Sequence, residues 1–227
     1  GIRGVGKTTT ARIVAKMLNC TVYDNNNDPD LDSCEQAKAI SEDRHPDVIE
    51  IDAASNTSVE NAREIIDNVK YNPVLGKYKV YIVDEVHMLS KSAFNALLKT
   101  LEEPPPHSKF IFATTEISKV PITILSRCQR FDLRRVEKKI LSNFLSSIAK
   151  KESISISKDA LNLIVKASDG SVRDSLSILD QANIFKSQKE IQTKEIINML
   201  GFSKQSDLYE LAKSILDNDL SKLILIL

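Results

Sequence analysis

Three short apolar runs in the first half of the chain have the composition of buried β-strands. They span residues 47–53, 79–84 and 109–115, and Val, Ile and Phe are prominent in them. Runs of this kind are typical of strands that are covered on both faces. The sequence therefore predicts three strands before residue 120.

Helical patterns separate these runs. Apolar side chains recur at helical spacing in residues 7–19. Thr57 followed by Glu60 has the spacing of a capping box for the next helix, Ser90 can cap a third, and the prolines at 104–106 end that one. Strands that alternate with helices indicate an α/β fold, with a parallel sheet flanked by helices.

The pattern changes after Arg134. Helical segments then follow one another, with no strand pattern between them, at residues 138–150, 157–167, 171–184 and 194–200. We therefore expect an α/β domain at residues 1–135, a small all-helical domain at 136–200 and the start of a further helical unit at 201–227.

Charge and composition limit the classes of function that the chain can have. The 31 basic and 31 acidic residues cancel, so the chain lacks the overall positive field of a free-standing nucleic-acid-binding protein, and any DNA contact must be local or shared. No apolar run approaches the ~20 residues of a membrane span, and no signal segment opens the chain. Three widely spaced cysteines argue against a disulfide framework. We expect a cytoplasmic protein without membrane contact.

A glycine-rich loop opens the chain. Residues 1–8 read GIRGVGKT, which satisfies the pattern G-x-x-x-x-G-K-[ST] and runs directly into an amphipathic helix. Glycines let successive backbone N–H groups face the phosphates of ATP, while the lysine reaches the β- and γ-phosphates and the hydroxyl ligates Mg²⁺. A glycine-rich turn before an ordinary helix is the alternative. The predicted ATP-binding residues of the loop are Gly1, Ile2, Arg3, Gly4, Val5, Gly6, Lys7 and Thr8.

Two carboxylates follow the second apolar run. Residues 80–85 read VYIVDE, which places Asp84 and Glu85 at the carboxyl end of a strand, where the ligands of open α/β sheets collect. There we expect Asp84 to bind Mg²⁺ together with Thr8, and Glu85 to orient and polarise the attacking water. A solvated turn is the alternative for two adjacent acids in this position.

Two short hydroxyl side chains end the third apolar run. We expect Thr114 and Thr115 to lie at the same edge of the sheet, to contact the nucleotide and to help position the water. Taken alone, they are equally typical of cap or turn residues. His87, which follows the two acids, is expected to pack or hydrogen-bond rather than to transfer protons.

Longer stretches of the sequence resemble one family. The ordered loop, acids and threonines are similar to those of AAA+ ATPases, and five stretches narrow the resemblance to the gamma/tau subunits of the bacterial DNA polymerase III clamp loader. They are EIDAASN at 50–56, YIVDEVHMLSKSAFNALLKTLEEPP at 81–105, FATTE at 112–116, ILSRCQRF at 124–131 and GSVRDSLSILDQA at 170–182. The resemblance runs from residue 1 to about residue 200.

The resemblance implies an AAA+ P-loop domain, a helical lid domain and the start of a helical collar domain that oligomerises. It also implies that the chain binds ATP and Mg²⁺, hydrolyses ATP and loads a sliding clamp onto primed DNA during replication. The implied partners are the other clamp-loader subunits of a hetero-oligomer, the sliding clamp, primed DNA and, through the holoenzyme, the replicative polymerase core. Polymerisation has no candidate residues in this chain, so DNA polymerase activity would belong to the holoenzyme.

Two arginines gain a role only from the resemblance. Arg127, in the Ser-Arg-Cys motif, matches the arginine finger that reaches into the ATP site of a neighbouring subunit, where such a group contributes roughly 10³–10⁵ in rate. Without the family, it would be a surface salt-bridge arginine. Arg173 matches the sensor arginine of the lid, which contacts the γ-phosphate. Its alternative is a helix-face pair with Asp169 or Asp174.

The family also carries a small zinc module after the first helix, and this chain departs from it. In the stretch from about residue 20 to residue 40, Cys20 and Cys34 align with two of the ligand positions, whereas a leucine and an alanine occupy the other two. Because a structural zinc site uses four ligands, we expect a degenerate module without zinc and two free thiols. Coordination by nearby Asp residues or by His45 is the alternative.

Three hypotheses for the function follow. The leading one is a clamp-loader ATPase whose hydrolytic site combines residues of two subunits. A second is a non-hydrolysing structural remnant, favoured because the strand that enters a phosphate loop would precede Gly1 and because the chain ends in mid-pattern at Leu227, so that both ends look truncated. A third is another AAA+ DNA motor, such as a branch-migration helicase, against which the Ser-Arg-Cys and LLKTLEEPP stretches argue.

Overall fold

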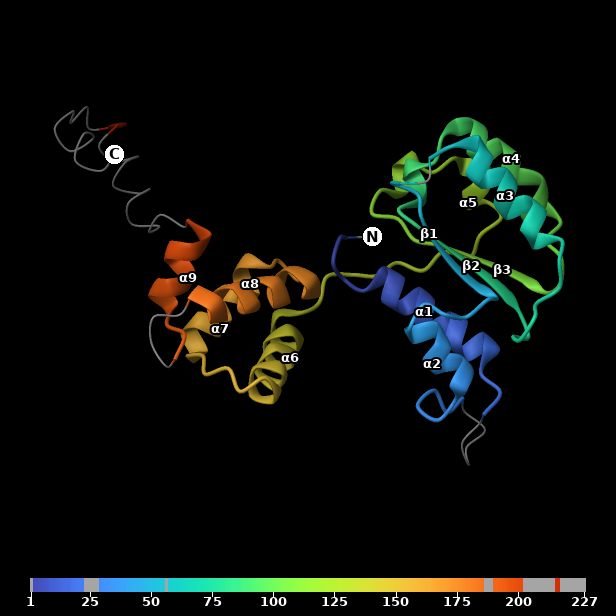
Figure 1. Cartoon of the computed structure of the whole chain (residues 1–227). Coiled ribbons are helices and arrows are strands. Elements are labelled where there is room, and N and C mark those ends of the chain that lie inside the picture. The colour runs from blue at the N-terminus through green and yellow to red at the C-terminus, as the bar shows by residue number, and fades with distance from the viewer. Residues whose placement is uncertain (1, 23–28, 56, 186–189, 202–214, 217–227) are drawn as a thin grey trace. The chain divides into compact units, whose positions relative to one another are not determined.

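The computed structural model describes residues 2–22, 29–55, 57–185, 190–201 and 215–216. The chain divides into two compact units, Gly1–Arg134 and Arg135–Leu227, and each is described by itself (Figure 1). The first unit is α/β and the second is helical, which confirms the predicted fold class. The further unit expected at 201–227 falls almost wholly outside the described residues, as does Gly1. No helix in the described ranges is both long enough and apolar enough to span a membrane.

The sheet of the first unit consists, among the described residues, of three parallel strands in the order β1-β2-β3. They are β1 (Val48–Asp52), β2 (Lys79–Asp84) and β3 (Ser108–Phe112). All three predicted strands are confirmed, although the third is shorter than expected and leaves Thr114 and Thr115 beyond its end. The register pairs Asp52 with Asp84, so the carboxyl ends of the strands lie at one edge of the sheet.

Helices cover both faces of this sheet (Figure 1). They are α1 (Lys7–Asn19), α2 (Glu35–Ser41), α3 (Val59–Val69), α4 (Lys91–Glu102) and α5 (Ile122–Leu125), with the short 3-10 turns η1 (Val86–Met88) and η2 (Ile117–Lys119). Successive side chains of the central strand point to opposite faces of the sheet, which explains the arrangement. Val80 and Ile82 pack with two alanines of α1 on one face, whereas Tyr81 and Val83 pack with α3 and α4 on the other.

Local sequence sets where the helices begin. Ser90 precedes α4, and its hydroxyl accepts a hydrogen bond at 3.1 Å from the backbone N–H three residues later, as predicted. The capping box expected for α3 is wrong by one residue. The helix begins at Val59, so the residue that precedes it is Ser58 rather than Thr57. Hydrogen bonds from its own backbone N–H and from the Ser58 hydroxyl lower the pKa of the Glu60 carboxylate.

A buried carboxylate fastens the segment that leads into β2. Asp47 precedes β1, and its two side-chain oxygens accept hydrogen bonds from the backbone N–H groups of Val74, Leu75 and Gly76, each at 2.7 Å. Burial alone would raise the pKa of Asp47, but these three hydrogen bonds outweigh it, so the pKa lies below its ordinary value. The carboxylate therefore stabilises the fold in its ionised form.

Replacing Asp47 with asparagine is expected to lower the free energy of unfolding by roughly 2–4 kcal/mol, because an amide NH₂ would face N–H donors that it cannot bind. Urea unfolding at pH 7 measures the change. Since the pKa of Asp47 is lowered on folding, its contribution is present above about pH 4 and is lost as pH falls through the folded-state value. The matched control Asp67→Asn, at an exposed carboxylate that pairs with Lys70, should change stability by less than about 0.5 kcal/mol. Equal effects of the two substitutions would contradict this role.

The second unit is built from four helices in the described part of the chain. They are α6 (Lys138–Lys151), α7 (Lys158–Ala167), α8 (Val172–Phe185) and α9 (Thr193–Leu200). Their apolar faces meet around the fully buried side chains of Leu145, Ile164 and Ile196. Gln192 and Glu195 form a capping box that begins α9, and Gly201, at a φ of 63°, ends it. The predicted helices of this half are thus confirmed.

Candidate functional site

The loop before α1 has the backbone of a phosphate-binding turn. Gly4 and Gly6 adopt φ values of 73° and 88°, in the left-handed region where side chains are strained, so glycine is required there. Gly6 immediately precedes α1, and its carbonyl accepts the hydrogen bond from the Thr10 N–H at 2.8 Å. The first N–H groups of α1 are then free to face an anion. The other described loop residues are the exposed Ile2 and Arg3 and the half-buried Val5.

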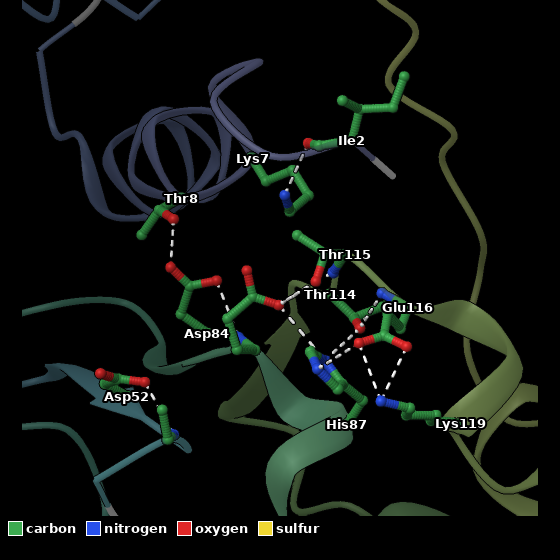
Figure 2. Close-up of polar contacts among 12 residues, drawn as sticks. Ile2, Lys7, Thr8, Asp52, Asp84, His87, Thr114, Thr115, Glu116 and Lys119 are labelled. Atoms are coloured by element: carbon green, nitrogen blue, oxygen red, sulfur yellow. Dashed lines mark hydrogen bonds and ion pairs between the residues drawn. The ribbon is translucent and has the colours of Figure 1, made fainter. Parts of the chain in front are cut away.

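The first two residues of α1 have different contacts (Figure 2). The Thr8 hydroxyl donates a hydrogen bond of 2.5 Å to the Asp84 carboxylate at the end of β2. The Lys7 ammonium instead donates to the Ile2 carbonyl at 2.9 Å. A hydroxyl and a carboxylate are the oxygen ligands that Mg²⁺ accepts, so the residues present fit a magnesium ion beside the phosphate loop. Their roles in binding it stay predictions.

The side chain of Glu85 is held by Thr115, which lies beyond the carboxyl end of β3. Its Oε2 atom accepts hydrogen bonds from the Thr115 backbone N–H at 3.0 Å and from the Thr115 hydroxyl at 2.8 Å. Glu85 itself has a φ of 45°, which is uncommon for a residue with a side chain. Such backbone strain is concentrated at functional sites. The structure therefore brings together the predicted water-orienting carboxylate and one of the two predicted threonines.

His87 contacts both Thr114 and the Glu85 carboxylate. Its side chain is 5% exposed, and Nδ1 lies 2.9 Å from the Thr114 hydroxyl and 3.3 Å from Glu85 Oε2. Nε2 lies 3.5 Å from a carboxylate oxygen of Glu116, as Figure 2 shows. The expected hydrogen-bonding role of His87 thus has specific partners, which sequence reasoning did not identify.

An ion pair that the sequence did not reveal fastens α1 to the sheet. Arg12 Nε and Nη2 donate hydrogen bonds of 2.6 and 2.9 Å to the two carboxylate oxygens of Glu50, on β1. The hydrogen bond to Glu50 raises the pKa of Arg12, against a smaller opposing effect of burial. Because the pair is bidentate, it fixes the orientation of the helix that carries Lys7 and Thr8. Only the three-dimensional fold shows that these two charges meet.

Arg127 follows α5 and is held by its own unit. Its Nη2 lies 2.5 Å from a carboxylate oxygen of Glu102, at the end of α4, and its Nη1 donates to the Thr123 carbonyl at 2.6 Å. These contacts fit the surface salt bridge that was the alternative for this residue. They also hold the guanidinium in a defined place, which an arginine finger requires. Its action on a neighbouring subunit stays a prediction.

Arg173 lies in the second unit, on α8, and its side chain is exposed. Asp169, one of the two carboxylates considered for it, pairs with Arg135. The sensor role of Arg173 was inferred from the family resemblance, and it too stays a prediction.

Cys20 and Cys34 belong to one small cluster of buried residues. Both are buried, and the Cys20 thiol donates a hydrogen bond of 3.0 Å to the Val22 carbonyl. Leu31 and Ala37, at the two other positions of the family's zinc module, pack against them. Within the described ranges, no third His, Cys, Asp or Glu completes a metal-binding group. These residues do not fit the four ligands of a structural zinc site, and the absence of zinc stays a prediction.

Two protein-family models match the chain. One, described as "DNA polymerase III, delta subunit", matches residues 1–137, and the other, described as "DNA polymerase III clamp loader subunit, ATPase lid domain", matches residues 141–188. The first match covers more than half of the chain. The chain belongs to the DNA polymerase III clamp-loader family. Within this family, the lid match falls in the helical second unit.

Named relatives of this clamp-loader chain are gamma and tau subunits. It is 51% identical to the tau/gamma subunit of Haemophilus influenzae over 88% of the chain, and 46% identical to the tau subunit of Bacillus subtilis over 97%. Over the whole length of this chain, it is 44% identical to the gamma subunit of Buchnera aphidicola from Schizaphis graminum. The matches span 29%, 39% and 62% of the lengths of these relatives, respectively. The gamma/tau resemblance is therefore confirmed.

Solved structures agree on the fold of this clamp-loader chain. The Holliday junction branch migration motor RuvB of Thermotoga maritima superposes with a TM-score of 0.63, over 95% of this chain and 66% of that one. The two sequences are 17% identical. This likeness concerns the fold alone and carries no argument for branch migration.

Proposed function

We propose that the chain is the ATP-binding and hydrolysing motor of a clamp-loader subunit, which loads a sliding clamp onto primed DNA during replication in the bacterial cytoplasm. The observation that carries the proposal is the contact between Thr8, in the first turn of α1, and Asp84, at the end of β2. It joins the phosphate loop to the two-carboxylate motif in one site. The gamma and tau names of relatives that are 41–51% identical support the clamp-loader part.

Mg²⁺ and ATP together supply a transferable phosphoryl group and a divalent charge that offsets its negative charge. The backbone N–H groups of Gly4–Lys7 would bind the phosphates, and Lys7 would exchange the Ile2 carbonyl for a phosphate oxygen. Thr8 and Asp84 would hold the metal ion through the two oxygens that now contact one another. Each of these groups acts by binding and orientation.

Glu85 would orient and polarise the attacking water. Within the described residues its contacts with Thr115 and His87 all use Oε2, which fixes the carboxylate and leaves Oε1 to accept the hydrogen bond of a water. Thr114 would act through His87, whose Nδ1 atom contacts both the Thr114 hydroxyl and Glu85 Oε2. A carboxylate placed in this way contributes roughly 10²–10⁴ in rate.

Hydrolysis in this proposal requires assembly. Arg127 would enter the ATP site of a neighbouring subunit and stabilise charge on the transferring phosphoryl group. Arg173 would contact the γ-phosphate from the lid. The partners are the other subunits of a hetero-oligomeric loader, the sliding clamp and primed DNA, with the replicative polymerase core reached through the holoenzyme. DNA polymerase activity belongs to that core.

Substitution of Lys7 by alanine tests the nucleotide site. Because Lys7 supplies a charged hydrogen bond to phosphate, ATP binding by the full-length protein should weaken by roughly 10- to 100-fold. Equilibrium titration with a fluorescent ATP analogue measures the change. Lys16→Ala, at the other end of α1, is the matched control and should bind as the native protein does. The proposed site is wrong if Lys7→Ala binds ATP with native affinity.

A further inference from the structure

A hollow with a basic lining lies between α6 and α7, two neighbouring helices of the second unit (Figure 1). Side chains from the first half of α6 and the second half of α7 surround a space of about 480 Å³. The polar and charged residues that line it are Lys138, Lys139, Ser142, Asn143, Asn162 and Lys166. The acids nearest to these residues in the sequence, Glu137, Asp159 and Asp169, do not line the hollow.

Helical spacing explains why these side chains gather in one place. Lys139 is three and four positions from Ser142 and Asn143 on α6, and Asn162 is four positions from Lys166 on α7. Residues at such intervals lie on one face of a helix. Two polar stripes therefore line one hollow, while other side chains of the same helices form the core of the unit.

The three lysines of the hollow, Lys138, Lys139 and Lys166, bring positive charge together. All three are exposed, and the described part of the chain offers their ammonium groups no ion-pair partner. Lys138 and Lys139 are in the first turn of α6, which contains no acidic residue. A cation is disfavoured there, because the N-terminal end of a helix is the positive end of its dipole. A bound anion would reduce the repulsion among these charges.

The chemistry of the lining suits phosphate oxygens. Ammonium groups donate charge-assisted hydrogen bonds to phosphate, and a serine hydroxyl and two asparagine amides add neutral donors. No aromatic side chain is among the described residues that line the hollow, and its one apolar residue, Val165, is 4% exposed. A base would therefore find no surface on which to stack. The hollow suits a phosphate backbone better than a base.

We propose that this hollow binds backbone phosphates of DNA, without preference for base sequence. The formal net charge of the chain is zero, so any contact with DNA has to be made by a local cluster of positive charge, and the hollow supplies one. The choice of DNA as the source of the phosphates rests on the proposed function, since the lining would also suit a free phosphate or a nucleotide. The hollow and the Thr8–Asp84 contact belong to different units.

The chemical reactivity of the lysines in the native protein measures this contact directly. The full-length protein, assembled with the other clamp-loader subunits and a slowly hydrolysed ATP analogue, is acetylated with and without primed DNA and analysed by mass spectrometry. We expect DNA at about ten times its Kd to slow the modification of Lys138, Lys139 and Lys166 roughly 10-fold, because only the unbound fraction reacts. Lys150 and Lys151, at the other end of α6, should react at the same rate in both samples.

Two further samples distinguish the sources of phosphate. Both lack DNA, and one contains the ATP analogue alone while the other contains inorganic phosphate alone. We expect neither to slow the modification of the three lysines as DNA does. Protection by the analogue or by inorganic phosphate, without protection by DNA, would overturn the assignment to DNA.

A pair of double variants tests the contact by affinity. Lys138→Ala with Lys139→Ala removes two lysines of the hollow. The matched control, Lys150→Ala with Lys151→Ala, removes the same charge from the other end of the same helix. Because about 0.9 counterion is released for each phosphate contact, the first variant should bind primed DNA roughly 10-fold or more weakly near 0.1 M salt. Its plot of log affinity against log salt concentration should be shallower by about 2, and the control should change little.

Fluorescence anisotropy of labelled primed DNA measures both quantities. The inference is overturned if DNA leaves the reactivity of the three lysines unchanged, if they are already unreactive in the assembled loader before DNA is added, or if the two double variants lose affinity equally. ATP turnover that depends on DNA, without this protection, would contradict the inference alone. Protection without turnover would contradict the motor proposal alone.

Discussion

Alanine in place of Arg127 is expected to slow ATP turnover by the assembled loader by roughly 10³-fold or more, because the charge on the transferring phosphoryl group loses its partner from the neighbouring subunit. ATP binding by the substituted subunit should stay close to native. The guanidinium is held by Glu102 and Thr123 of its own unit, whereas the phosphate loop, Thr8 and Asp84 form a separate cluster of contacts. Turnover in mixed assemblies and nucleotide titration of the subunit measure the two quantities.

The control for this experiment is Arg130→Ala. Arg130 is an exposed arginine three positions along the chain, and it pairs with Asp132. Its removal should leave both turnover and binding unchanged, since exposed pairs contribute little. A loss of ATP binding in Arg127→Ala would show that Arg127 serves its own site, and the role in a neighbouring site would then be wrong.

Glutamine in place of Glu85 is expected to slow turnover by roughly 10²- to 10⁴-fold with ATP binding retained, because an amide cannot polarise a water as a carboxylate does. The amide oxygen can still accept the hydrogen bonds of the Thr115 N–H and hydroxyl. The fold of the site should therefore survive the change. Single-turnover hydrolysis after pre-binding of ATP separates the chemical step from binding.

Glu103→Gln is the matched control for Glu85→Gln. Glu103 is an exposed carboxylate at the end of α4, and its neutralisation should not change the single-turnover rate. Hydrolysis by Glu85→Gln at the native rate would favour the alternative in which the two acids form only a solvated turn. It would also require another group to orient the water.

Sequence periodicity predicted the layers of the fold because they depend on local patterns. The three apolar runs became β1, β2 and β3, and the Ser90 cap was found where expected, since a serine hydroxyl just before a helix is within reach of the N–H three residues later. The Gly6 turn was predicted from the motif for the same reason, because only glycine adopts its φ of 88° without strain.

Contacts between distant segments were not predictable from one sequence. The Asp47 carboxylate binds three N–H groups of residues 74–76, which no pattern around Asp47 reveals. The Arg12–Glu50 and Arg127–Glu102 pairs likewise depend on how helices and strands pack, as does the burial of Cys20 and Cys34 in one cluster. The α3 helix begins at Val59, one residue later than a Thr57 cap implies, and Thr57 and Ser58 are both residue types that cap helices.

The same difference between local patterns and contacts of distant segments applies to the candidate site. Asp84 and Glu85 were predicted because a strand delivers them to the ligand-binding edge of the sheet, and Thr8 was predicted because it ends the phosphate-loop motif. The direct Thr8–Asp84 contact and the restraint of Glu85 by Thr115 and His87 needed the structure. The roles of Arg127 and Arg173 rest on family resemblance, so experiments on assembled subunits carry the most information about them.

The most direct test of the motor proposal is ATP turnover by the full-length protein assembled with the other clamp-loader subunits, measured with and without the sliding clamp and primed DNA. The account predicts turnover that rises when clamp and primed DNA are both present and that depends on Glu85. Turnover that clamp and primed DNA leave unchanged, or an assembled loader that binds ATP without hydrolysing it, would contradict the account.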